Sequence, residues 1–543
     1  MAPGYNQWKC QLNMTKPLEK YVKHGTVFGP TDAGMIKVHD IDILRKFFDP
    51  QNKICNAIKL NPSIVIGRRG SGKTAYLHSV FLDSEYQVVL EIRTSKTFSQ
   101  IVSQIESNTP RYALVEEIEA LWEDLFFLAL IAELAKKYSR KSQELSRLKD
   151  FIAKVDPDTS IPIDSFLWKV VKSLSSRNSG NLIGSVSSIV EQVTGVDFEY
   201  AKTIALNLLE LEGIRAIILL DSLEQYPVEI PSVAHALSGL LKCAGQFNER
   251  YDRFSLRLCL PAELYHTFFD YVSTNPHKDL TPPNALTLHW VAGELLSISA
   301  HRLALFLDMY FPKLGTEYYY TPSMNRSDAR DFLLSFLPMT VINALGQHED
   351  TLAYILRHTQ LQPRHLLLYL NAIFERERTH GSKYPRISSE SVVKAISANE
   401  YLLAEEVFSG YLKQHPNTRV LCEACIPELP LIFREPDLHQ VFIRKGKKAT
   451  GERDFVEFRR ILIETGIVGR VVDSTDRYTV GRFEYTEPHK LVVGSKDELC
   501  LHPVFASAFN CRLLPGKLHK PIYPYGSDPE AEDYRSWQFS GDS

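Results

Sequence analysis

The chain has 543 residues, 44% of them hydrophobic and 23% charged, which is the balance of a folded protein with about two to four domains. Its 62 basic and 65 acidic residues leave a formal net charge of -3, which excludes a globally basic nucleic-acid coat protein and a polybasic membrane binder. The 8 cysteines follow no regular spacing, so no disulfide framework is expected. The first residues, MAPGYNQWKC, lack the pattern of a signal peptide, and no apolar run reaches the roughly 20 residues of a spanning helix. We therefore expect a cytoplasmic protein with no membrane partner.

Short apolar runs and longer helical patterns alternate through the first half of the chain. The stretch from about 105 to 210 is mostly helix-like, with strong periodicity over 116–138. Strands that are buried on both faces read as continuous apolar runs, and parallel strands are joined by helices. The pattern therefore predicts an α/β core with a parallel sheet. Its expected strands span 63–66, 87–92, 216–220 and 254–260.

The strongest motif follows the first of these strands. The residues GRRGSGKT at 67–74 match G-x-x-x-x-G-K-[ST], the phosphate loop of nucleotide-binding proteins. Glycines let the backbone N–H groups point at phosphate oxygens, while the lysine reaches the β and γ phosphates and the hydroxyl binds Mg²⁺. A glycine-rich turn that binds nothing is the alternative, but a buried strand precedes the loop and a helix-like run follows it. The expected nucleotide-binding residues are Gly67, Gly70, Ser71, Gly72, Lys73 and Thr74.

An acidic residue for the metal stands at the end of another expected strand. Asp221 directly follows 216–220, at the carboxyl end where ligands bind in open α/β sheets. We expect Asp221 and Thr74 to bind Mg²⁺, and Glu224 to orient or deprotonate the attacking water. The alternative for Glu224 is a solvated carboxylate at a helix start. No N-K-x-D tetrad for reading guanine follows the loop, so ATP is expected rather than GTP.

The second half of the chain changes character. It is mainly helical from 286 to 400, and a helix over 455–465 is then closed by Gly466. A hairpin after this helix, with its turn around 473–476, would be the wing of a winged-helix-like module. The expected strands of this region are 477–485, 490–493 and 499–505.

Several of these segments resemble the AAA+/STAND group of P-loop ATPases. DSLEQ at 221–225 is similar to their second acidic motif, and LHW at 288–290 is similar to a helix start in their lid region. QPRHL at 362–366 resembles the region that carries their sensor-2 arginine, and the likeness runs over about 50 to 400. With its winged-helix-like end, the layout resembles prokaryotic P-loop ATPases that are related to origin-recognition-type ATPases, many of them associated with anti-phage defence.

The resemblance implies roles for particular arginines. It implies that Arg364 reaches the γ-phosphate, whereas an arginine at a helix start with a structural partner is the alternative. Arg302 and Arg357 are candidates for an arginine finger, with surface salt bridges as the alternative. The sequence departs from the group at Ser222, which interrupts the Asp-Glu pair and bears on the hydrolysis rate, and no sensor-1 residue is assigned.

A basic segment lies in the C-terminal part. From Arg444 to Arg460, seven basic residues stand against three acidic ones, so the segment is a local basic patch in a weakly acidic protein. Such a patch on a winged helix indicates contacts with the phosphates of duplex DNA. A solvated loop and a surface for docking another protein are the alternatives, because the expected recognition helix carries Glu457 and Glu464.

Together these observations predict an α/β P-loop NTPase with a parallel sheet, a helical lid and a winged-helix-like domain. The expected function is an ATP-binding and ATP-hydrolysing switch or motor-like protein, a component of an anti-phage defence system that acts with a protein effector or sensor and forms a homo-oligomer. An ATP-regulated DNA-binding protein or loader, and a nucleotide-stabilised scaffold with negligible turnover, are the alternatives. The expected parts are an N-terminal arm (1–50), an ATPase core (51–285, with the helical insertion at about 105–210), a lid (286–400) and a C-terminal module with its tail (401–543).

Overall fold

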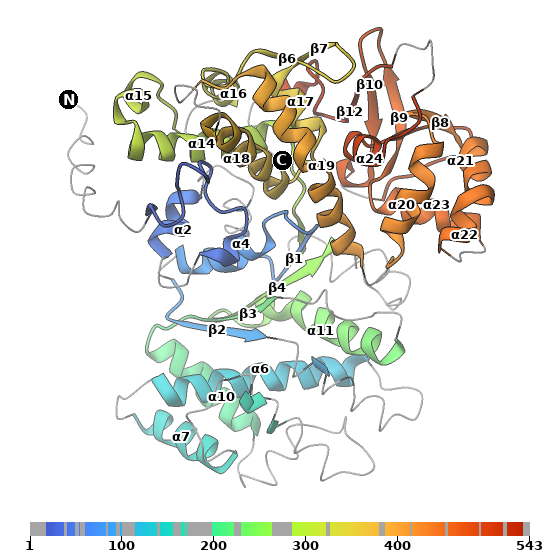
Figure 1. Ribbon diagram of the computed structural model, residues 1–543. Helices are drawn as coiled ribbons and strands as arrows, with labels where there is room; N and C mark the ends of the chain where they lie inside the picture. Colours follow the sequence, from blue (N-terminus) through green and yellow to red (C-terminus); the bar gives the residue numbers. More distant parts are fainter. Residues whose placement is uncertain are drawn as a thin grey trace. The chain divides into compact units, whose positions relative to one another are not determined.

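The computed structural model forms two compact units (Figure 1). One unit comprises Ala57–Arg68 and Lys73–Leu288, and the other comprises Met1–Asn56, Arg69–Gly72 and His289–Ser543. Each unit is described below by itself. The residues that the structure describes are 18–36, 41–48, 54, 60–82, 85–93, 98–99, 102, 115–137, 142–155, 163, 165–167, 169–170, 198–221, 230–262, 285–321, 326–379, 386–412, 415–450, 454–487, 490–513 and 519–535.

The first unit is built on a five-stranded parallel sheet with the strand order β2-β3-β4-β1-β5. The inner strands are apolar and buried throughout most of their length, as expected of strands covered on both faces. β2 lies at an edge and exposes Glu91 between buried Leu90 and Ile92. The strands are β1 (Ile64–Gly67), β2 (Val88–Arg93), β3 (Ala216–Asp221), β4 (Phe254–Pro261) and β5 (Ala285–Thr287). The predicted α/β class and its first strands are confirmed.

Helices cover both faces of this sheet. In Figure 1, α4 (Lys73–His78) lies on one side of the strands, and α6 (Val115–Lys137) and α11 (Pro231–Arg250) lie on the other. The helices α6 and α11 approach so closely that a Cβ atom on Gly239 would lie 2.5 Å from Ile118 Cγ2. Two further helices, α7 (Gln143–Val155) and α10 (Phe198–Leu211), pack on α6 and extend the apolar core. Within the expected helical insertion, α6 therefore covers the sheet, and α7 and α10 form a further layer on α6.

The second unit contains the N-terminal segment, a group of helices and a C-terminal sheet. Its helices include the expected patterns at 291–307 and 363–375, which form α14 and α18. A short antiparallel pair, β6 (Thr340–Ile342) and β7 (His348–Asp350), joins two of the helices. The helical elements are η2 (Ala33–Met35), α2 (Ile41–Phe47), α14 (Ala292–Tyr310), α15 (Pro312–Glu317), α16 (Arg326–Leu334), α17 (Thr351–Arg357), α18 (Pro363–Thr379) and α19 (Ser389–Tyr411). None of the helices in the described part of the chain has the length and apolarity of a membrane-spanning segment.

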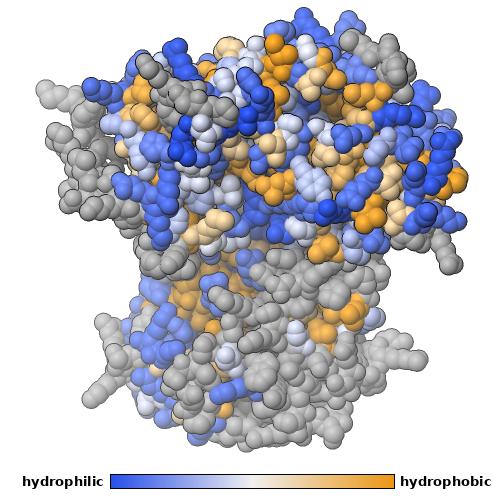
Figure 2. Space-filling model, in the orientation of Figure 1, coloured by the Kyte–Doolittle hydropathy of each residue, from blue (hydrophilic) through white to orange (hydrophobic). Residues whose placement is uncertain are grey.

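The C-terminal module carries a five-stranded sheet with the order β12-β10-β9-β11-β8, drawn in orange and red in Figure 1. β9 and β10 pair antiparallel and form the predicted hairpin, and α23 is the predicted helix before it. In Figure 2 the surface over α21 and α22 is mainly hydrophilic, with single apolar residues between. The strands are β8 (Ile432–Arg434), β9 (Val468–Ser474), β10 (Thr479–Arg482), β11 (Glu498–Leu501) and β12 (Ile522–Pro524). The helices are α20 (Thr418–Cys425), η6 (Ile426–Glu428), α21 (Glu435–Val441), the π-helix η7 (Phe442–Gly446), α22 (Lys447–Thr450), α23 (Phe455–Glu464), η8 (Glu484–Thr486), α24 (Pro503–Ala508) and α25 (Glu532–Arg535).

Two expected strands of this module are wrong. Residues 490–493 form no strand, because side chains satisfy their backbone: Leu491 N donates to Glu484 Oε2 at 2.9 Å, and Arg459 Nη2 donates to Val493 O at 2.6 Å. The strand expected over 499–505 ends at Leu501. His502 Nδ1 then accepts a hydrogen bond from Val504 N at 3.2 Å and caps α24, which starts at a proline.

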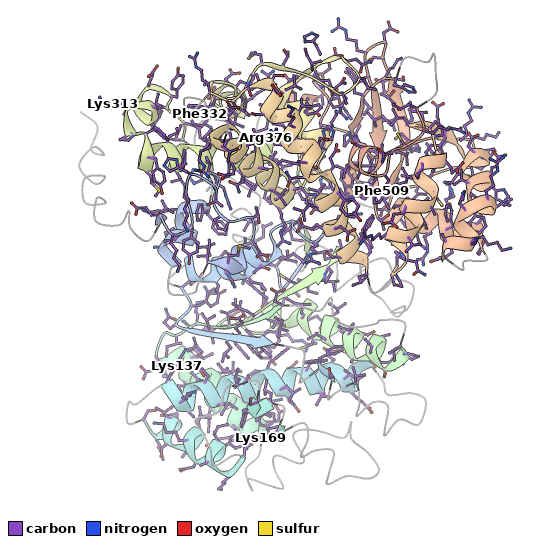
Figure 3. All side chains as sticks on the ribbon, viewed as in Figure 1. Lys137, Lys169, Lys313, Phe332, Arg376 and Phe509 are labelled. Atoms are coloured by element: carbon purple, nitrogen blue, oxygen red, sulfur yellow. The ribbon has the colours of Figure 1, made fainter. Side chains whose placement is uncertain are left out.

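Buried polar groups join the C-terminal module to the helices of its unit. Arg357 pairs with Glu349 through two hydrogen bonds of 2.8 and 3.0 Å, and Tyr523 OH donates to Glu349 Oε2 at 2.6 Å. Apolar contacts run alongside, since the ring of Phe509 (labelled in Figure 3) lies 5.9 Å from the ring of Phe408 on α19. A buried, fully bonded ion pair is costly to break, so these contacts make the module and the helices one packed body.

Glu400 provides a test of this packing. Burial raises the pKa of Glu400 to about 7 from its ordinary value of 4.5, and its carboxyl accepts a hydrogen bond from Ser507 Oγ at 2.5 Å. The folded chain therefore binds this proton more tightly than the unfolded chain. The stability that the neutral carboxyl contributes is present below about pH 4.5 and is lost as the pH rises through about 7.

We expect Glu400→Gln to remove this dependence, because the amide stays neutral and still accepts from Ser507. Between pH 5 and 8, the free energy of unfolding of the wild type should fall by up to about 3 kcal/mol relative to the variant. Denaturant unfolding at several pH values measures it. Glu390→Gln, an exposed change on the same helix, is the control. Parallel profiles of wild type and Glu400→Gln would contradict the prediction.

Candidate functional site

The phosphate loop joins β1 to α4 and contains two glycines in the left-handed region, Gly70 with φ +89° and Gly72 with φ +98°. Both glycines also lie against other side chains. A Cβ on Gly70 would lie 2.8 Å from Gln362 Oε1 and 3.1 Å from Arg364 Cβ, and one on Gly72 would lie 2.8 Å from Ile54 Cδ1. Conformation and close approach therefore both require glycine at these positions.

The tip of the loop, Arg69–Gly72, belongs to the unit that contains the helices and the C-terminal module. Trp290 Nε1 donates to Ser71 O at 2.8 Å, and Arg69 Nη1 donates to Ser409 Oγ at 2.7 Å. The hydroxyl of Ser71 is buried and has no hydrogen-bond partner within the described ranges. A buried hydroxyl without a partner is costly, and a phosphate oxygen would satisfy it.

Lys73 begins α4, and its ammonium group folds back over the start of the loop. Nζ donates to Gly67 O at 2.7 Å and to Arg68 O at 3.0 Å. A phosphate oxygen would bind this ammonium group more strongly than these neutral carbonyl oxygens do, because it adds the attraction between opposite charges. The lysine is therefore held beside the loop with a charge that an arriving phosphate can attract.

Thr74 and Asp221 come from elements far apart in the sequence, and the sheet brings them together. Thr74 Oγ1 donates to Asp221 Oδ2 at 3.3 Å, and Asp221 is half-buried at the carboxyl end of β3. A hydroxyl and a carboxylate are hard oxygen ligands of the kind that Mg²⁺ prefers. The pair fits the predicted metal side of the site. Glu224, the predicted base, lies outside the described residues.

Arg364 is the second residue of α18 and lies next to the loop tip, where its N–H donates to Gly70 O at 3.4 Å. Its guanidinium pairs with two carboxylates, with Asp32 at 2.5 Å and with Glu406 at 3.0 Å. The position near the loop agrees with the predicted contact with a phosphate, and the two carboxylates agree with the alternative of a structural partner. Sequence reasoning did not find Asp32 or Glu406, because nothing in the spacing of residues 32, 364 and 406 indicates a contact.

Neither of the other two arginines forms an exposed salt bridge, which corrects the expected alternative: Arg302 is half-buried on carbonyl oxygens and Arg357 is buried. Arg302 Nη1 donates to Phe28 O at 3.0 Å and Pro30 O at 2.7 Å, and burial lowers the pKa of its guanidinium to about 10. Arg357 is buried in its pair with Glu349. Both side chains make contacts within the same unit, the one that contains residues 289–543.

Comparisons with known proteins identify no family for this chain. No protein-family model matches it, and no curated protein matches it. A search of solved structures finds the structure of the ORC2 protein of Aeropyrum pernix in ADPNP-ADP complexes. The two sequences are 10% identical, the match covers 87% of this chain and 92% of that chain, and the TM-score is 0.34. At that identity and TM-score the match does not establish a function for this chain.

The contact at Gly70 can be separated from its backbone conformation. We expect Gly70→Ala to destabilise its unit more than Gly346→Ala does, because Gly346 also has a positive φ, +77°, but no atom within 4 Å of an added Cβ. The extra loss from the clash with Gln362 and Arg364 should be about 1–3 kcal/mol of unfolding free energy. Thermal and denaturant unfolding of both variants measures it. Equal losses would show that the loop tip does not pack on residues 362–364.

Proposed function

We propose that this chain binds ATP with Mg²⁺ through residues 67–74 and hydrolyses it as a conformational switch. The observation that carries the proposal is the Thr74–Asp221 contact of 3.3 Å, in which the hydroxyl after the loop lysine donates to a carboxylate at the carboxyl end of β3. A glycine-rich turn that binds nothing has no need of this carboxylate. The absent guanine tetrad favours adenine.

Each residue of the site then has a chemical task. The backbone of Gly67, Gly70, Ser71 and Gly72 would hold phosphate oxygens, and Lys73 would neutralise charge on the β and γ phosphates. Thr74 and Asp221 would hold Mg²⁺, which when bound supplies charge neutralisation at the phosphates. In this proposal Glu224 orients the attacking water, and Arg364 contacts the terminal phosphate.

The output of such a switch is a change in conformation rather than a phosphorylated small molecule. The sequence has no recognisable nuclease or hydrolase motif that would supply a second activity. A protein effector or sensor, a homo-oligomer and a place in anti-phage defence are therefore parts of the proposal that the resemblance alone supports. A nucleotide-stabilised scaffold with little turnover remains the outcome if ATP binds without being hydrolysed.

Lys73→Ala tests the nucleotide site. Because the variant loses the ammonium group that would face the phosphates, we expect ATP affinity to fall at least about tenfold and hydrolysis to be lost. Isothermal titration with Mg²⁺–ATP and phosphate release measure the two effects. Lys313→Ala, at an exposed lysine of α15, is the matched control. Unchanged binding in Lys73→Ala would remove the proposal.

A DNA-binding role is the second candidate, and exposed basic residues of the C-terminal module favour it. Arg444, Lys445, Lys447 and Lys448 are all exposed on η7 and α22. The predicted recognition helix α23 offers fewer basic side chains for phosphate contacts, because Arg459 donates to Val493 O at 2.6 Å and Arg460 pairs with Glu457 at 2.6 Å. Phosphate contacts would therefore come from 444–448 rather than from α23.

Neutralising three of these residues tests the DNA-binding role. We expect Lys445→Ala, Lys447→Ala and Lys448→Ala together to weaken duplex DNA binding and to lower the salt slope by up to about 3, because each lost phosphate contact releases one fewer counterion. Fluorescence anisotropy over a salt series measures both. A triple alanine variant at Lys136, Lys149 and Lys313, which are exposed elsewhere, keeps the same net charge as a control. Absence of binding by the wild type at low salt would eliminate this role.

A further inference from the structure

Two carboxylates hold the arginine that lies beside the loop tip. Arg364 Nη2 pairs with Asp32 Oδ2 at 2.5 Å, and Nη1 pairs with Glu406 Oε1 at 3.0 Å. Asp32 comes from the N-terminal segment and is the more exposed partner, with 36% of its side chain accessible against 19% for Glu406. Asp32 is therefore the carboxylate that water reaches more readily, and it is hydrated more easily than Glu406 when its ion pair with Arg364 breaks.

The N-terminal segment is held by side chains that bind its main chain. Arg302 donates to Phe28 O and Pro30 O, as described above. Asn371 Oδ1 accepts from Phe28 N at 2.9 Å, and its Nδ2 donates to Gly29 O at 3.1 Å. The chain thus leaves Pro30 in a fixed position, two residues before Asp32.

Asp32 itself is oriented by the turn that follows. Its Oδ1 accepts a hydrogen bond from Gly34 N at 2.8 Å and caps the 3₁₀ helix η2, while Oδ2 faces Arg364. One oxygen therefore has a structural task and the other carries the contact with the guanidinium. This division allows the charge of Asp32 to be removed without removal of the cap.

Arg364 reaches the loop through backbone and side chain. Its Cδ would lie 3.5 Å from a Cβ on Gly70, and the neighbouring Gln362 keeps a buried carbonyl oxygen, Oε1, without a hydrogen-bond partner in the described part of the chain. The loop tip thus packs against a cation and an unsatisfied polar group. In the proposed function, backbone N–H groups of the loop hold phosphate oxygens and the guanidinium of Arg364 contacts the terminal phosphate.

A guanidinium binds carboxylate and phosphoryl oxygens through the same planar N–H groups. An oxygen of a terminal phosphate that approaches Nη2 would therefore compete with Asp32 Oδ2 for the same guanidinium. Glu406 lies within the 23-residue helix α19, so it can keep Arg364 oriented while Asp32 leaves. The partly exposed carboxylate of Asp32 loses little on leaving, since water takes the place of the guanidinium.

We propose that Asp32 is a specificity residue of the nucleotide site, an internal competitor for Arg364 that lowers the affinity for a nucleoside triphosphate relative to the diphosphate. Glu406 is the positioning residue of the same arginine. This inference rests on the proposed function. It adds a role for the N-terminal segment, which a triphosphate displaces and a diphosphate does not.

The test is Asp32→Asn, in which an amide oxygen can still cap η2 but the charge is gone. Isothermal titration with Mg²⁺ and a non-hydrolysable ATP analogue, and separately with Mg²⁺–ADP, compares the two affinities. We expect the triphosphate to bind about three- to tenfold more tightly and the diphosphate to change less than about twofold, the size of a partly exposed ion pair. Asp331→Asn, at an exposed carboxylate of α16, is the matched control.

Further variants separate competition from a general charge effect. In an Arg364→Ala background, Asp32→Asn should have no effect on the affinity for either nucleotide. With Arg364 present, Glu406→Gln should weaken triphosphate binding, whereas Asp32→Asn strengthens it. Asp32→Ser, which also caps a helix, replaces Asp32→Asn if the latter melts at a lower temperature than the wild type.

The outcomes are distinct. Equal strengthening of both nucleotides, no change in either, or an effect that persists without Arg364 would overturn the inference while the proposed ATP site stands. A wild-type chain that binds neither nucleotide would overturn the proposed function and this inference together.

Discussion

The parallel sheet sets the position of the site in its unit. Because all pairings among β1 to β5 are parallel, the carboxyl ends of β1 and β3 lie along one edge, although about 150 residues of the chain separate them. The phosphate loop leaves from one of these ends and Asp221 stands at the other. The contact between Thr74 and Asp221 is thus a consequence of strand direction and needs no special folding of either segment.

What the sequence predicts well is the part of the chain where local pattern and burial agree. The inner strands are covered on both faces, so continuous apolar runs mark them closely, and the glycine spacing of the loop marks Gly70 and Gly72. The wrong strand at 490–493 has a local apolar pattern but its hydrogen bonds go to Glu484 and Arg459, which no pattern in the segment reveals.

The interactions that sequence reasoning missed are long-range contacts between polar side chains. Asp32 meets Arg364 across more than 300 residues, and Trp290 meets the main chain of Ser71 across more than 200. Arg302 and Arg357 look alike in the sequence, yet one holds two carbonyl oxygens and the other a buried carboxylate. Charge alone indicates that such residues need partners, and only the fold shows which partners they have.

The docking of the N-terminal segment has a consequence for evolution. Arg302 and Asn371 bind carbonyl and N–H groups of residues 28–30, and every amino acid except proline would supply these groups at position 28. Arg302 therefore constrains the path of the segment far more than the identity of its side chains. During long divergence such a segment would keep its backbone path while its amino acids change. A sequence alignment would then no longer detect the segment although the structure still preserved it.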